Sequence, residues 1–126
     1  MLNLIKKHTK NYYIFLFSVL ATVFLTGCSP HTATGTWLVS EVNTNNYSKI
    51  IVHFEPKLEI YSAQSNKPAL YCGWSGANKS DIILECMSSE DQKEMDVYQL
   101  NVTDESKAEL VYKGEVIAKF TRSPES

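Results

Sequence analysis

Hydrophobic and polar residues alternate with a period of two along most of the chain after residue 35. Such alternation over short runs indicates β-strands that bury one face. Clusters of Asn, Ser, Asp, Gly and Pro separate the runs, which is typical of turns. The pattern predicts no helix in this region. It predicts eight short strands, over residues 36–42, 49–54, 57–61, 69–75, 81–87, 95–102, 107–112 and 115–122.

Eight short strands with regular turns predict an all-β domain, either an antiparallel up-and-down barrel or a sandwich. Strands of five to seven residues reach about 17–23 Å. The interior of an eight-stranded barrel is just wide enough to be filled by side chains or to hold one small ligand. A packed interior is favoured over a ligand cup, and the aromatic side chains expected to fill much of it are Trp37, Phe54, Trp74 and Phe120.

Residues 1–27 have a different pattern. Lys6, Lys7 and Lys10 precede an apolar run over residues 12–25. As a helix this run would be about 21 Å long, shorter than the hydrocarbon core of a bilayer at about 30 Å. A basic start, a short apolar run and small residues after it are typical of a secretory signal peptide. An uncleaved N-terminal anchor helix is the alternative.

The apolar run ends in Leu25-Thr26-Gly27-Cys28, which resembles the lipobox of bacterial lipoproteins. The resemblance implies cleavage before Cys28, thioether lipidation of its sulfur and acylation of the new N-terminus. Two or more acyl chains give stable membrane anchoring. In the sorting pattern of that family, a residue other than Asp after the cysteine favours the outer membrane, and here it is Ser29. We therefore expect the mature protein at the periplasmic face of the outer membrane.

Cleavage would divide the chain into a signal peptide (residues 1–27), a lipidated tether (28–34), a barrel domain (35–122) and a C-terminal tail (123–126). The leader carries three lysines and no acidic residue, so its removal changes the net charge from −2 to −5. A negative chain excludes the strongly basic nucleic-acid-binding proteins. It also argues against electrostatic binding to anionic lipid head groups.

The cysteine count fits the same division. If a lipid occupies Cys28, then Cys72 and Cys86 remain as a pair in an oxidising compartment, where a disulfide is expected. Two reduced core thiols are the alternative. Placing Cys72 opposite Cys86 in a hairpin puts the apolar residues of both strands on one face. The same register sets two further pairs opposite each other, Trp74 with Leu84 and Gly76 with Ile82.

The two ends of the barrel region carry a recognisable pair of motifs. Gly35-Thr36-Trp37 opens the first strand, and Phe120-Thr121-Arg122 closes the last. This arrangement resembles the small bacterial lipocalin-like domain, in which a G-x-W start and a late Arg bracket an eight-stranded up-and-down barrel. The resemblance implies that Trp37 packs under the closed end and that Arg122 stacks across it in a structural cation–π contact.

Catalytic and metal-binding patterns are sparse. His31 lies on the predicted tether, His53 alternates toward solvent, and neither has a partner at the spacing of a zinc site. The chain has no Gly-rich phosphate loop and no G-x-S-x-G motif. Four carboxylates fall on solvent-facing positions with no cleft to join them: Glu55, Glu59, Glu85 and Glu109. The sequence therefore predicts no enzyme, no metal site and no cofactor.

Recognition is expected at the surface. The large side chains predicted to point away from the core, as a possible partner surface, are Tyr61, Tyr71, Val111 and Ile117. The leading function is a membrane-anchored binding module for an envelope protein, in an inhibitor, immunity or assembly role. The alternative is a carrier of a small apolar ligand in the barrel cup. A cavity of several hundred Å³ would favour the carrier, and a filled barrel would favour the binding module.

Overall fold

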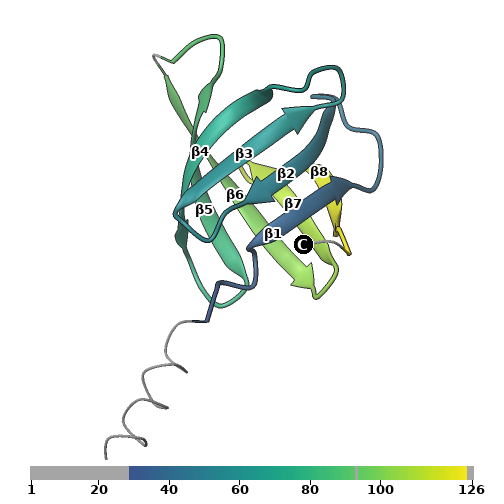
Figure 1. Ribbon diagram of the computed structural model, residues 1–126, viewed down its shortest axis with the longest axis vertical. Helices are drawn as coiled ribbons and strands as arrows, with labels where there is room; N and C mark the ends of the chain where they lie inside the picture. Colours follow the sequence, from purple (N-terminus) through teal and green to yellow (C-terminus); the bar gives the residue numbers. More distant parts are fainter. Residues whose placement is uncertain (1–28, 93, 125–126) are drawn as a thin grey trace, which may run out of the picture. The chain divides into compact units, whose positions relative to one another are not determined.

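A computed structural model describes residues 29–92 and 94–124, so the predicted signal peptide and Cys28 lie outside the described residues. Residues His31–Ser126 form one compact unit. Its strands are β1 (Gly35–Val39), β2 (Tyr47–Val52), β3 (Lys57–Ser62), β4 (Pro68–Gly76), β5 (Asp81–Ser88), β6 (Met95–Asp104), β7 (Lys107–Tyr112) and β8 (Glu115–Arg122). Each strand pairs antiparallel with the next, and β8 pairs with β1 to close a barrel (Figure 1). The predicted all-β, eight-stranded up-and-down barrel is confirmed.

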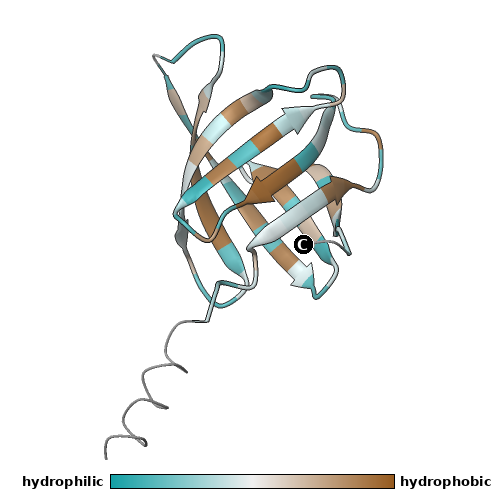
Figure 2. Cartoon of the chain, in the orientation of Figure 1, coloured by the Kyte–Doolittle hydropathy of each residue, from teal (hydrophilic) through white to brown (hydrophobic). Residues whose placement is uncertain are grey.

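The alternation in the sequence is also the alternation of burial. Along β5, Ile82, Leu84 and Cys86 are buried, while Ile83 and Glu85 between them are exposed. The same banding of hydrophobic and hydrophilic residues follows the other strands around the barrel (Figure 2). Because the ring is closed, apolar faces from all eight strands converge on one interior.

Apolar side chains fill the interior of the barrel. A void large enough for a water molecule would leave exposed surface on the side chains that line it. The central side chains have none, and these are Trp37, Ile50, Leu58, Ile60, Ile82, Leu84, Leu100 and Leu110. Within the described part of the chain, no polar or charged residue is buried. Burying each large apolar side chain stabilises the fold by roughly 1.5–3 kcal/mol.

The prediction that Phe54 faces the interior is wrong. Strand β2 ends at Val52, two residues earlier than expected, and the His53 amide donates to the carbonyl oxygen of Lys57 across the β2–β3 turn at 3.0 Å. Phe54 therefore lies in the turn and is 70 % exposed. Trp74 is partly buried against the core, as its register predicts.

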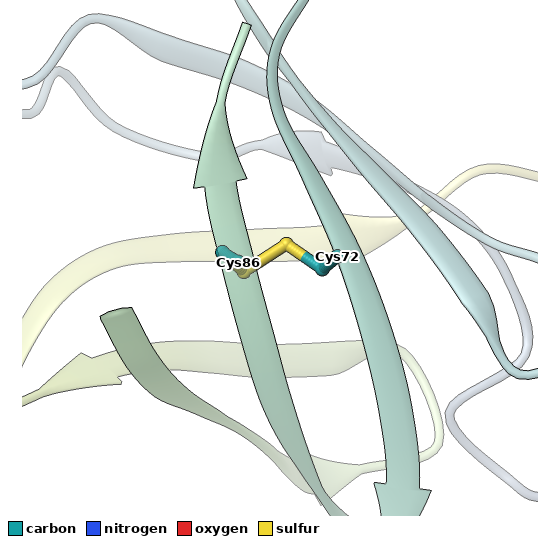
Figure 3. The surroundings of a disulfide bond; sticks show 2 residues. All are labelled: Cys72 and Cys86. Atoms are coloured by element: carbon teal, nitrogen blue, oxygen red, sulfur yellow. A yellow bond between two sulfur atoms is a disulfide. The ribbon is translucent and has the colours of Figure 1, made fainter. Parts of the chain in front are cut away.

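The predicted disulfide is present in the predicted register. Cys72 on β4 is bonded to Cys86 on β5, with an S–S distance of 1.99 Å, and both side chains are buried (Figure 3). The two further expected pairs are also directly opposite each other, Trp74 with Leu84 and Gly76 with Ile82. The bridge joins neighbouring strands within the sheet.

Loss of this disulfide should destabilise the barrel by about 3 kcal/mol, because the bridge restricts a loop of about 15 residues in the unfolded chain. The measurement is urea unfolding of the Cys72→Ala/Cys86→Ala variant against the wild type. The wild type in reducing agent is the matched control and should approach the variant. Equal unfolding midpoints, with free thiols detected in the untreated protein, would contradict this expectation.

Candidate functional site

The two ends of the barrel differ in how they are covered. One end carries the start of β1, residues 31–34 and three turns, at residues 53–56, 77–80 and 105–106. We call it the Arg122 end. The opposite end, called the far end, carries the connections at residues 40–46, 63–67, 89–94 and 113–114.

Arg122 clamps the N-terminal segment onto the barrel. Its guanidinium carbon lies 4.2 Å from the centroid of the Trp37 ring, which confirms the predicted cation–π pair. Arg122 Nε donates to the carbonyl oxygen of Glu105 at 2.9 Å, and Nη1 donates to that of Thr34 at 2.8 Å. Nη2 donates to the carbonyl oxygen of Thr32 at 2.5 Å. The planar fork of donors on one side chain thus joins two separate segments of backbone.

Residues 31–34 of the predicted tether (28–34) are packed on the Arg122 end. Ala33 is fully buried, and its carbonyl oxygen accepts from the Trp37 indole nitrogen at 2.9 Å. His31 Nε2 donates to the carbonyl oxygen of Asn78 at 2.7 Å, and its Nδ1 accepts from the Ala33 amide at 3.0 Å. The His31 ring also meets the edge of Trp74, with centroids 5.8 Å apart. The folded unit therefore begins at His31 rather than at Gly35.

A second polar cluster lies on the outer face of β2 and β3. His53 Nε2 donates to Glu59 Oε1 at 2.5 Å, and the Tyr61 hydroxyl donates to Glu59 Oε2 at 3.2 Å. The hydrogen bond from His53 is the largest cause that lowers the pKa of Glu59 below its ordinary value. Burial, followed by the Glu59 charge, raises the pKa of Tyr61. Both oxygens of this carboxylate are engaged by neighbouring side chains on the convex surface of the sheet.

The four residues predicted as a partner surface do not gather in one place. Tyr61 and Tyr71 lie on β3 and β4, whereas Val111 and Ile117 lie four strands further round, on β7 and β8. Ile117 was expected to point outward, and this is wrong, because it packs against the core. The β7–β8 register shifts after Leu110, which places Val116 opposite Val111 and leaves Ile117 unpaired in the ladder.

A different apolar row stands on the outside of the barrel. Tyr71 on β4, Met87 on β5 and Met95 on β6 are directly opposite one another across three strands. Val97 lies two residues after Met95 and is therefore on the same face. Tyr71 is 45 % exposed, and Met95 and Val97 are each 59 % exposed. This row could have been predicted from the sequence. Tyr98 and Leu100 are inward positions of β6, and side chains alternate along a strand, so Met95 and Val97 must point outward.

Residues 29–92 and 94–124 contain neither a candidate metal site nor a candidate membrane-spanning helix. No group of three or more His, Cys, Asp or Glu side chains could hold a metal ion there. The same residues contain no helix of the length and apolarity needed to cross a bilayer.

The protein is a small antiparallel barrel with a filled interior. Arg122 holds residues 31–34 at one end, and an apolar row is exposed on the outside of β4, β5 and β6. The chain matches no protein-family model, no curated protein and no solved structure.

Replacing Arg122 by Lys should destabilise the barrel by about 1–3 kcal/mol, because an ammonium cannot reach three carbonyl oxygens and stack on Trp37 together. The measurement is the free energy of unfolding in urea, with hydrogen exchange of the Ala33 and Thr34 amides as a local readout. The matched control is Lys119→Ala, which removes an exposed contact of 3.9 Å to Glu41 and should change stability by less than about 1 kcal/mol. Equal exchange rates and equal stability in the Arg122→Lys variant and the wild type would show that Arg122 does not hold residues 31–34 on the barrel.

Proposed function

We propose that this chain is a lipid-anchored envelope protein that acts as a binding module for a protein partner, in an inhibitor, immunity or assembly role. The anchor would be Cys28, after removal of residues 1–27, and the site of action the periplasmic face of the outer membrane. The barrel would be of the small bacterial lipocalin-like type. The Trp37–Arg122 pair across the end of the barrel supports that affiliation.

One observation carries the choice of a protein partner. The central interior side chains, from Trp37 to Leu110, have no exposed surface, whereas Tyr71, Met95 and Val97 are exposed on the outer face. A carrier needs an internal volume of several hundred Å³ for an apolar ligand, and that volume is occupied here by the core of the protein itself. Exposed apolar groups that share one face are typical of contact surfaces for other proteins.

The Cys72–Cys86 bridge supports export. Disulfides persist in oxidising compartments, such as the bacterial periplasm, and are rare in the cytosol. This bridge uses the two cysteines that remain once Cys28 is assigned to the lipid.

The Cys28→Ser variant should be released from membranes into the soluble fraction, because serine has no thiol to form the thioether. The measurement is fractionation followed by immunodetection. Ser29→Asp is the matched control: it keeps the lipid site and should remain membrane-bound, with a shift from outer to inner membrane. A Cys28→Ser protein that stays in the membrane fraction would overturn the lipid anchor.

The full-length lipoprotein, tagged at its C-terminus and solubilised from the envelope, should purify with one protein in a fixed molar ratio. Mass spectrometry of the intact complex measures that ratio and detects any bound small molecule. A second tagged lipoprotein purified in parallel controls for partners that follow any membrane anchor. A bound apolar molecule at one per barrel, with no protein partner, would instead favour the carrier.

A further inference from the structure

The apolar row on the outside of β4, β5 and β6 serves no packing role within the described barrel. Tyr71, Met87 and Met95 face away from an interior that is already filled, and Val97 continues the row along β6. Because β6 pairs with β7 only from Tyr98 onward, the stretch from Met95 to Val97 pairs with β5 alone. This part of the sheet extends past its neighbour and forms an accessible corner of the barrel (Figure 1).

Acidic residues surround this corner. Glu85 stands directly opposite Val97, on the same face, and is exposed, and the exposed Glu94 ends the β5–β6 connection just before Met95. Asp96 lies on the other face of β6, opposite Cys86, where its Oδ1 accepts from the Tyr112 hydroxyl at 3.3 Å. Between residues 85 and 96 the sequence has five acidic residues and one lysine, a net charge of −4. Most of the net negative charge expected of the mature chain is therefore concentrated on one hairpin. The loop of this hairpin is hydrophilic along its tip, beyond the apolar positions (Figure 2).

The hairpin also stands at the end of the barrel away from the N-terminal segment. The β5–β6 connection belongs to the far end, whereas residues 31–34 are clamped on the Arg122 end. Two residues separate His31 from Cys28, so an anchor at Cys28 restrains the Arg122 end. β5 is, in addition, four strands from β1 around the ring, which leaves its outer face open to partners.

We propose that this surface, made of Tyr71, Glu85, Met87, Met95 and Val97 beside the acidic β5–β6 connection and called here the acidic corner, binds a protein whose contact surface is basic around an apolar centre. The inference rests on the proposed binding function and names its surface and the chemistry of its partner. Apolar side chains at the centre supply the contact area, and carboxylates at the rim select a positively charged partner. A second copy of this chain is disfavoured because two acidic corners repel, and an anionic lipid surface is disfavoured for the same reason.

The first test places a photoreactive amino acid in the full-length lipoprotein, in its own cells, at Val97. The matched position is Leu38 on β1, which is 43 % exposed and lies three strands from β6 around the ring. We expect a protein adduct at Val97 that is about tenfold more abundant than at Leu38. Adducts at Leu38 but not at Val97 would overturn the acidic corner and leave the binding function standing. Absence of protein adducts at both positions would overturn the proposed binding function itself.

The second test measures the affinity of the full-length protein in detergent for the cross-linked partner. Val97→Ser and Glu85→Lys should each weaken binding about tenfold, since one removes apolar contact and the other places a cation against a basic surface. Leu38→Ser is the matched control and should change the affinity less than about twofold. Wild-type binding should also weaken as salt is raised from about 0.05 to 0.5 M. Salt-independent binding, an adduct with a second copy, or an adduct with lipid would each overturn the proposal.

Discussion

An eight-stranded ring encloses a nearly fixed cross-section, and in this protein the side chains occupy it. Trp37 and Phe120 alone take much of that space, with exposures of 0 and 1 %. A core at this density resists both enlargement and insertion, because added volume forces strained side chains or shifts the strands. A ligand could enter only by displacing the groups that stabilise the barrel. The filled interior is why the proposed recognition falls on the outer face, to which the strands turn every second side chain.

The closing seam explains why Arg122 is placed where it is. β1 and β8 share three paired positions, whereas β4 and β5 share seven. Trp37 and Arg122 are directly opposite each other at one end of that short seam. The cation–π contact and the hydrogen bonds to the carbonyl oxygens of Thr32 and Thr34, just before β1, add interactions across this shortest ladder of the ring. The same contacts help to hold residues 31–34 on the barrel, so one side chain contributes both to closing the ring and to packing that segment.

The alternation of apolar and polar residues was sufficient to predict the strand order and the barrel. It also predicted the Cys72–Cys86 register, because pairing the two cysteines had to leave the apolar residues of both strands on one face. The errors arise where the period is interrupted. Phe54 follows a strand that ends early, and Ile117 sits at a register shift, and a single residue of offset reverses which face is buried. The packing of Ala33 was not predictable in this way, since it depends on an indole nitrogen four residues later that needs a buried acceptor. Period and spacing hold no information about such contacts.

The disulfide has a consequence for the outer face as well as for the core. Tyr71 and Met87 are opposite each other and lie one residue from Cys72 and Cys86 respectively, on the other side of the same two strands. A covalent link between the strands at this level fixes the spacing of the outward pair. Preorganised side chains lose less conformational freedom when a partner binds. The bridge therefore stabilises the folded chain and fixes β4 against β5 beneath Tyr71 and Met87, which joins the interior packing to the surface proposed for recognition.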